Sequence, residues 1–185
     1  MRKLLFAAVL IAAMTIVGCV PYSIHPLCSD NDLVTEPTLA GVWGQDDQNK
    51  MTFIANDDKT YKLIHVDDGL AAEFEVRLFK VKDWLMMDIC PGEPPEDMNQ
   101  TYKDMILPLH FLLRVDKTKP DLVLGSLDFD WLKATLAADP TLLDYTEYSG
   151  SVIITAQTEK IQAFLKEHLT DESFDNDTMD TPRLE

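Results

Sequence analysis

From residue 39 onward, apolar and polar residues alternate in short runs that are separated by turn-forming residues. A period of two is typical of strands with one buried face. Asp67-Asp68-Gly69 ends in an Asp-Gly pair between two alternating runs, which is a strong hairpin signal. The runs predict strands at residues 39–44, 51–55, 61–66, 73–81, 84–90, 106–115, 122–127 and 152–155.

Two of these strands depart from simple alternation. In residues 73–81 the apolar positions change phase at Phe79 and Val81, which predicts a bulge or a twist. Residues 84–90 are apolar on both faces, so we expect protein on both sides of that strand. A proline-rich, acidic loop follows to about residue 104.

Helical spacing occurs in two places. Asp128 stands at an N-cap position before residues 129–138, and Pro140 ends that short helix. Thr158 is expected to cap a final helix whose apolar residues form one stripe at Ile161, Phe164, Leu165 and Leu169. Residues 141–150 fit neither pattern, and the acidic residues 171–185 predict a disordered tail.

Strands joined by tight turns run antiparallel, and neighbours in sequence usually pair. The pattern therefore predicts a mainly β fold, an up-and-down barrel of about eight antiparallel strands with a short helix before the last strand and a C-terminal helix. Closing residues 152–155 against residues 39–44 would remove the open edges. A barrel of that size is filled by side chains or holds one small ligand.

The start of the chain has the pattern of a secretory leader. Arg2 and Lys3 precede an apolar run, which is shorter than the roughly 20 residues of a membrane-spanning helix and ends in Ile16-Val17-Gly18-Cys19. These four residues resemble a bacterial lipobox. The resemblance implies cleavage between Gly18 and Cys19, a diacylglyceryl group on the Cys19 thiol and acylation, for example with palmitate, of the new amino terminus. The alternative is an ordinary signal peptide with a chance cysteine.

The lipobox resemblance also implies a compartment and a domain plan. Residue 20 is valine, whereas an aspartate after the cysteine tends to retain such proteins in the inner membrane. We therefore expect a lipid anchor in the outer membrane, facing the periplasm. The expected parts are a signal peptide at 1–18, a lipidated tether at 19–38, the barrel with its C-terminal helix at 39–170 and the acidic tail at 171–185.

The chain is strongly acidic, with 16 basic and 32 acidic residues. Loss of residues 1–18 makes the net charge of −16 more negative by two, because Arg2 and Lys3 are removed. Such a surface repels nucleic acid, so nucleic acid is excluded as a partner. Solubility explains the charge, and attraction of a basic partner is the alternative.

With Cys19 acylated, Cys28 and Cys90 remain as an even pair in an oxidising compartment, and we predict a disulfide between them. The sequence does not show whether their Cα atoms come within the required distance of about 7 Å. His25 and Cys28 have the spacing of two metal ligands, but a turn residue and a structural thiol explain them better without a companion cluster. We expect no metal and no cofactor.

Leu39-Ala40-Gly41-Val42-Trp43 resembles the Gly-x-Trp opening of lipocalin-like barrels. That resemblance implies that Trp43 closes one end of the barrel. Residues 23–43 and Asp130-Trp131-Leu132-Lys133 are similar to uncharacterised bacterial lipoproteins, and this likeness covers most of the mature chain. It implies no activity.

The sequence carries no nucleophile elbow, phosphate-binding glycine loop or zinc-binding helix motif. We therefore expect a non-enzymatic protein, and a strongly perturbed carboxylate in a deep cleft would be needed to favour an enzyme. The first functional hypothesis is a small apolar ligand in the barrel, with Phe53, Tyr61, Phe74 and Trp84 as wall candidates. The second is a protein-interaction module, such as a periplasmic inhibitor or assembly factor, with a filled barrel and a basic partner. His110 is expected in the core or at its rim.

Overall fold

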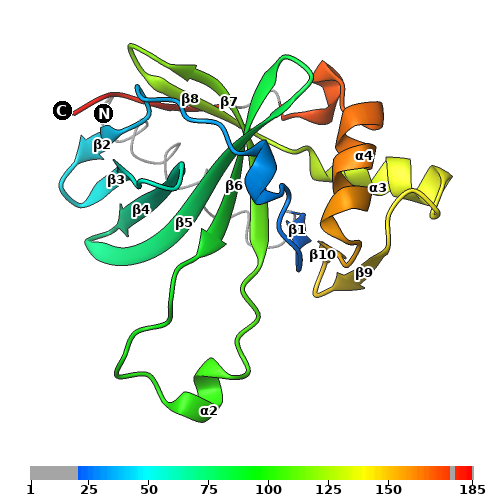
Figure 1. Cartoon of the computed structure of the whole chain (residues 1–185), viewed down its shortest axis with the longest axis horizontal. Helices are drawn as coiled ribbons and strands as arrows, with labels where there is room; N and C mark the ends of the chain where they lie inside the picture. The colour runs from blue at the N-terminus through cyan, green and yellow to red at the C-terminus, as the bar shows by residue number, and fades with distance from the viewer. Residues whose placement is uncertain (1–20, 176–177, 185) are drawn as a thin grey trace, which may run out of the picture.

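The computed structural model describes residues 21–175 and 178–184, and it shows a mainly β protein (Figure 1). The predicted lipidation site Cys19 and the predicted cleavage site lie outside the described residues. The strands are β1 (Tyr22–Ser23), β2 (Gly41–Asp46), β3 (Asn49–Ala55), β4 (Thr60–Asp67), β5 (Leu70–Val81), β6 (Trp84–Pro91), β7 (His110–Thr118), β8 (Leu122–Ser126), β9 (Tyr145–Tyr148), β10 (Ser151–Ile154) and β11 (Met179–Thr181). The helices are α2 (Gln100–Lys103), α3 (Phe129–Ala138) and α4 (Thr158–His168), with short 3₁₀ helices η2 (Asp30–Asp32) and η3 (Asp171–Ser173).

The strands form one large, mostly antiparallel sheet. Strands β2 to β7 are neighbours in sequence order, as the turn chemistry predicts. The second edge of β7 is shared, because its first residues pair with β1 and its later residues pair with β8. β1 is also paired in parallel with β10, which forms a hairpin with β9. The prediction of a mainly β, largely antiparallel fold is confirmed.

The two ends of the meander do not meet in the predicted way. β10 (Ser151–Ile154), the strand expected to close against β2, pairs instead with β1 and β9. The reason lies in residues 141–150, which fitted neither pattern. They supply the partner strand β9 and a tight turn at Ser149 and Gly150, both of which have positive φ.

The C-terminal segment lies between β8 and β2. β11 pairs with β8, and beyond β11 the N–H of Gly44 donates to the carbonyl of Pro182 at 2.9 Å. The N–H of Leu184 donates to the carbonyl of Val42 at 2.8 Å. The described part of residues 171–185 therefore differs from the disordered tail that the composition predicts: it holds η3 and β11, and Phe174 is buried.

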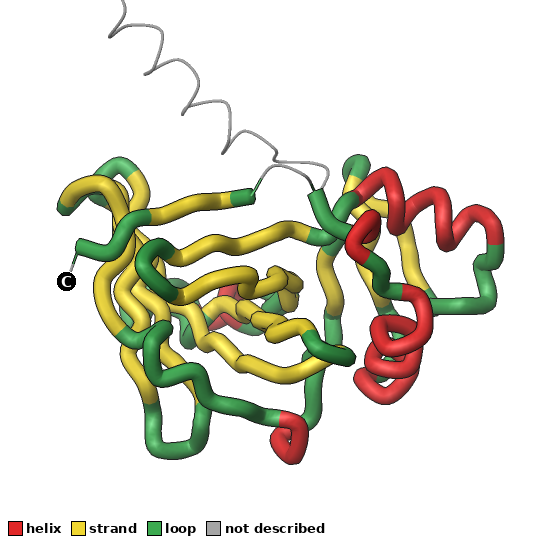
Figure 2. Tube along the Cα trace, turned by 90° about the horizontal axis from the view of Figure 1, so that it is seen from above, coloured by secondary structure: helices red, strands yellow, loops and turns green. Residues whose placement is uncertain are grey.

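Two hydrophobic cores lie on opposite sides of this sheet. The strands curl around the first, and α3 and α4 lie together beside them (Figure 2). The inner core consists of Leu39, Trp43, Phe53, Tyr61, Leu63, Val76, Leu78, Met87, Leu113, Val115, Leu122 and Leu124. The outer core joins the opposite face of the sheet to α3, α4 and the N-terminal residues through, among others, Leu27, Cys28, Leu33, Phe79, Met86, Leu112, Leu132, Leu136, Ile161, Phe164 and Leu165.

Strands β5 and β6 have protein on both faces. In β6, Met86 lies in the outer core and Met87 in the inner core, which confirms the prediction for the apolar run 84–90. In β5, Leu78 faces the inner core and Phe79 the outer core. Of the two alternatives predicted at Phe79, a bulge or a twist, the bulge is absent, because the β5–β6 register runs without a shift. Consecutive residues at this end of β5 are apolar because the inner core covers one face of the strand and the outer core covers the other.

The prolines and charges of residues 21–38 predict a tether that lifts the domain off the membrane or lies across its surface, whereas the structure packs this segment onto the domain. Leu27, Cys28 and Leu33 are buried in the outer core. The N–H of Val34 donates to the carbonyl of Leu78 at 2.9 Å. This N-terminal segment is therefore part of the folded body.

Both predicted longer helices are present. The carboxylate of Asp128 caps α3 by accepting from the N–H of Trp131 at 2.6 Å. α4 buries Ile161, Phe164 and Leu165 in the outer core, so the predicted apolar stripe faces that core. The Thr158 hydroxyl does not cap α4, and donates instead to the carbonyl of Pro26 at 2.7 Å.

Candidate functional site

The inner core is filled by large side chains. Trp43 is fully buried, its indole N–H donates to the carbonyl of Leu39 at 2.8 Å, and the Arg183 guanidinium lies 4.7 Å from the centre of its ring. The buried hydroxyl of Tyr61 accepts from the N–H of Glu36 at 2.9 Å. Trp43, which the lipocalin resemblance places at the barrel end, is thus covered by a cation and held by a hydrogen bond.

The residues proposed as walls of a ligand site do not share one surface. Phe53, Tyr61 and Phe74 belong to the inner core, where they pack against its other members. Trp84 packs against the outer core, with its ring 5.7 Å from that of Phe174. These side chains contribute to two separate cores, so they do not form a common binding cavity.

A small cavity of about 20 Å³ lies between the sheet and the helices. It is lined by side chains that include His110, Leu27, Leu132 and Phe164. A volume of that size accommodates about one water molecule. The cavity is therefore too small for a lipid or another organic ligand.

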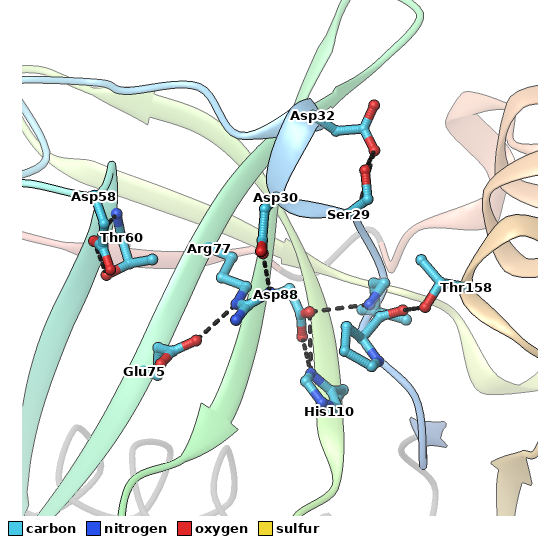
Figure 3. Close-up of polar contacts among 12 residues, drawn as sticks. Ser29, Asp30, Asp32, Asp58, Thr60, Glu75, Arg77, Asp88, His110 and Thr158 are labelled. Carbon is cyan, nitrogen blue, oxygen red and sulfur yellow. Dashed lines mark hydrogen bonds and ion pairs between the residues drawn. The ribbon is translucent and has the colours of Figure 1, made fainter.

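Asp88 and His110 form a buried acid–base pair beside this cavity (Figure 3). The Nδ1 atom of His110 lies 2.9 Å and 3.0 Å from the two carboxylate oxygens of Asp88. Asp88 is 1% exposed and His110 8% exposed. The same carboxylate accepts from the N–H of Leu27 at 3.0 Å, so it also binds the N-terminal segment to the sheet.

The strand geometry explains how this pair forms. Asp88 on β6 lies opposite Leu112 on β7, and His110 is two residues before Leu112 on the same face. Burial alone would lower the pKa of His110. The hydrogen bond that His110 donates to the Asp88 carboxylate, together with the other interactions with Asp88 and Cys90, outweighs burial and raises the pKa of His110 to about 9. At neutral pH the His110 side chain is therefore an imidazolium.

The two cysteines have different surroundings, and both are free thiols. The predicted disulfide is thus absent from the structure. Cys28 is buried in the outer core, and burial together with the nearby Asp88 carboxylate raises its pKa to about 12. Cys90 is half-buried near the end of β6.

His25 and Cys28, which have the sequence spacing of two metal ligands, have different surroundings. Nε2 of His25 lies 2.9 Å from the side-chain nitrogen of Gln157, whereas Cys28 is buried in the outer core. Within residues 21–175 and 178–184, no group of three or more His, Cys, Asp or Glu side chains has the arrangement of a metal site.

A long connection between β6 and β7 projects from the body, and we call residues 92–109 the arm (Figure 1). The strand predicted to start at Ile106 begins only at His110, and residues 104–108 are exposed. Tyr102, Met105, Ile106 and Leu107 make up four of the nine large apolar side chains that are exposed in the described residues. The arm therefore presents a concentrated apolar surface.

The arm is also rich in acidic residues. The arm carries Glu93, Glu96, Asp97 and Asp104 against a single lysine, Lys103. At its base, the N–H of Gly92 donates to the carbonyl of Glu73 at 2.9 Å, which attaches the arm to β5. An apolar tip with an acidic margin is complementary to an apolar groove bordered by basic residues.

Comparisons of the chain with protein-family models, with curated proteins and with solved structures give no match. In the part of the chain that the structure describes, none of the helices has the length and apolar character that crossing a bilayer requires.

The sequence contained a signal for the buried pair that the prediction did not use. Asp88 is the one charged residue between Trp84 and Cys90, in a strand expected to be covered on both faces. A buried carboxylate needs a hydrogen-bonding or charged partner, and His110 on the next strand satisfies that need. The late start of β7 did have a signal that the prediction did not use, because Pro108 has no N–H to donate to a strand ladder and proline is depleted in strands.

Proposed function

We propose that this chain is a lipid-anchored, non-enzymatic protein of the bacterial cell envelope that acts by binding another protein. The observation that carries the proposal is the filled inner core, in which Trp43, Phe53 and Tyr61 are each at most 2% exposed. A carrier of apolar ligands needs an interior cavity of several hundred Å³. A filled interior leaves the outer surface for recognition.

The lipocalin-like barrel is part of this proposal. Strands β2 to β8 follow one another around the inner core, and the C-terminal segment is hydrogen-bonded to both β8 and β2. In a barrel of this kind, that segment would take the closing position that the sequence pattern assigned to residues 152–155.

The membrane anchor in this proposal is acylated Cys19, in the outer membrane and facing the periplasm. Its support is the lipobox-like Ile16-Val17-Gly18-Cys19 and the absence of an aspartate at position 20. Because residues 21–38 pack onto the body, an anchor at Cys19 would hold the domain near the membrane surface. Metabolic labelling with palmitate should mark the wild type and leave Cys19→Ser unlabelled, and equal labelling of the two would contradict the anchor.

The arm is the docking element of this proposal, and its partner is a protein with an apolar groove bordered by lysine or arginine. Exposed apolar side chains gathered at one place mark interaction sites more often than scattered ones. The surrounding carboxylates select a basic partner and disfavour anionic lipid. Partner binding should weaken steeply with salt, because exposed charges are screened within about 10 Å at 0.1 M ionic strength.

Site-specific photocrosslinking in cells tests the docking element. A photoreactive residue replaces Leu107 in the arm or, as a matched control, Leu70 at the β4–β5 turn, both of which are exposed leucines. The proposal predicts a discrete protein crosslink from position 107 and none from position 70. The crosslinked protein, once purified, should bind the wild-type chain less tightly as salt increases.

Two further variants separate charge recognition from a general surface effect. Glu96→Lys in the arm should weaken binding of that purified protein, whereas Asp57→Lys, an exposed carboxylate in the β3–β4 turn, should not. Crosslinking of position 107 to lipid alone, or equal protein crosslinks from positions 70 and 107, would contradict the docking proposal.

A further inference from the structure

The C-terminal segment, residues 178–184, lies in a slot between the edges of β8 and β2. β11 forms an antiparallel ladder with β8, and beyond β11 the residues up to Leu184 are hydrogen-bonded to β2. The segment is held mainly through its backbone, because none of the side chains of residues 178–184 is buried. A slot that binds backbone can accept another extended segment that repeats the same hydrogen bonds.

The contacts of this segment predict that it detaches without unfolding the rest of the domain. Met179 and Leu184 are 45% and 41% exposed, so their side chains add nothing to the inner or the outer core. Segments with few buried contacts and solvent-exposed hydrogen bonds open locally. The position near the end of the chain helps, because only one end of the segment has to remain attached. The slot can therefore exchange occupants while both cores stay intact.

One side chain of the segment has a specific receptor. The guanidinium of Arg183 donates from Nη1 to the carbonyl of Thr38 at 3.0 Å and from Nη2 to the carbonyl of Ala40 at 2.8 Å. Its Cζ atom lies 4.7 Å from the centre of the Trp43 ring. Two carbonyls beside an aromatic face suit a planar guanidinium, whereas the ammonium group of lysine lacks this planar fork. The slot therefore selects an arginine at this position.

An open hollow of about 670 Å³ adjoins this receptor. Its walls are Pro37, Thr38, Lys119 and Pro120, and of residues 178–184 only Arg183 lines it. A partner segment with a large side chain beside its arginine would gain contacts in the hollow that residues 178–184 do not make. A partner needs such extra contacts, because it competes with a covalently attached occupant whose effective concentration is in the millimolar range.

We propose that this slot is a second interaction surface, which binds an extended, arginine-containing segment of a partner protein as an added strand in place of residues 178–184. The net charge of −16 favours a basic occupant over an acidic one. Residues 178–184 are then a resident occupant that shields the edges of β8 and β2 until the partner binds. This surface shares no residue with the arm and does not depend on the lipid anchor.

A reversible lock on the resident segment tests the exchange in the full chain. Asp180 lies opposite Val123 in the β8–β11 ladder, at a spacing that a disulfide can bridge. Asp180→Cys with Val123→Cys, in a chain that also carries Cys19→Ser and Cys90→Ser, gives a segment that is locked when oxidised and free when reduced. The probe is a fluorescent peptide with the sequence of residues 178–184, and its anisotropy measures binding. The reduced chain should bind the peptide about tenfold or more tightly than the oxidised chain.

Two comparisons test the arginine receptor. In the Cys19→Ser chain, Arg183→Ala weakens the resident segment and leaves the slot intact, so this variant should bind the peptide about tenfold more tightly than its parent does. A peptide with lysine in place of the arginine should bind the same variant about tenfold more weakly, because lysine lacks the planar fork.

Three results would overturn the proposal. The first is equal peptide binding by the locked and the unlocked chains, or no binding by either of them or by Arg183→Ala. The second is equal binding of the arginine and the lysine peptides. The third is a doubled mass of the Cys19→Ser chain in light scattering that Arg183→Ala reverses, which would assign the slot to a second copy of this chain.

Discussion

At the scale of single residues, Asp88 joins three segments of the fold. Its carboxylate accepts hydrogen bonds from the imidazolium of His110 and from the N–H of Leu27. Asp88 therefore connects β6, β7 and the N-terminal segment. A carboxylate taken out of water loses hydration energy and is stable only when it is paired and hydrogen-bonded. Asp88 meets both conditions, which explains why a charged residue is tolerated between two hydrophobic cores.

Removal of this carboxylate should destabilise the fold strongly. Asp88→Ala leaves His110 and the Leu27 N–H without their partner, and the expected loss in the free energy of unfolding is about 3–5 kcal/mol. Urea unfolding of the Cys19→Ser background measures it. Asp57→Ala, which removes an exposed carboxylate, should change stability by less than about 0.5 kcal/mol. Equal effects of the two substitutions would contradict the role given to Asp88.

The pair should also make stability depend on pH. The pKa of His110 is about 9 in the folded state, above its value of about 6.5 in the unfolded chain. The folded state therefore holds the proton more tightly, and its advantage is complete below pH 6.5 and lost as pH rises to 9. The free energy of unfolding should fall by about 3 kcal/mol over this window.

Urea unfolding at several pH values between 6 and 9.5 measures this fall. His110→Gln provides the comparison, since the difference between the two chains isolates the imidazole from other titrating groups. A slope that is the same in the wild type and in His110→Gln would show that the pair does not titrate as described.

Residue identities were partly readable from the sequence. The N-cap at Asp128 was predicted correctly because its signal is local, a carboxylate just before a helical run. The pairing of Asp88 with His110 depends on the β6–β7 register across an intervening arm, which local patterns do not set. Cys28 and Cys90 were predicted to bond on count and compartment alone, and the structure instead places them in different surroundings.

At the scale of elements, the C-terminal segment has an unexpected role. It covers the edge of β8 through β11 and the edge of β2 through its hydrogen bonds to Val42 and Gly44. Unpaired edges promote association between chains, so a covering strand also protects solubility. Arg183, which lies over the ring of Trp43, adds a cation–π contact at the same place.

Deletion of residues 178–185 should therefore destabilise and oligomerise the protein. Each backbone hydrogen bond contributes on the order of 1 kcal/mol to stability. The deletion removes the hydrogen bonds between β11 and β8 and the two hydrogen bonds from the C-terminal segment to β2. The expected loss is roughly 3 kcal/mol or more by urea unfolding, with a larger particle by light scattering. Leu184→Ser keeps the backbone bonds and should behave like the wild type. A deletion variant as stable and as monodisperse as the wild type would contradict this account.

Elements were predictable where the pattern is local and unreliable where tertiary contacts decide. The hairpins β3–β4 and β4–β5 follow from their turn residues. Residues 21–38 looked like a spacer because prolines and charges dominate their composition, yet Leu27 and Leu33 bury themselves in the outer core. β11 escaped prediction because a short acidic edge strand carries little periodicity.

At the scale of the whole molecule, the sheet separates two interiors with different content. The inner core is a packed hydrophobic core, whereas the outer core contains the buried Asp88–His110 pair and the small cavity beside it. A mainly β fold with a few helices followed from the sequence. The content of its interior did not, because alternation states which face is buried but not whether the buried side chains fill the space.

The central claim is that the interior is filled, so that the protein acts through its surface. Titration of the purified Cys19→Ser chain with a fluorescent fatty acid tests this claim most directly, with an established apolar-ligand carrier as the positive control. The account predicts no saturable change in fluorescence at any fatty-acid concentration below its solubility limit. Saturable binding with one site per chain, abolished by a substitution in the inner core such as Phe53→Trp but not by one in the arm, would contradict it.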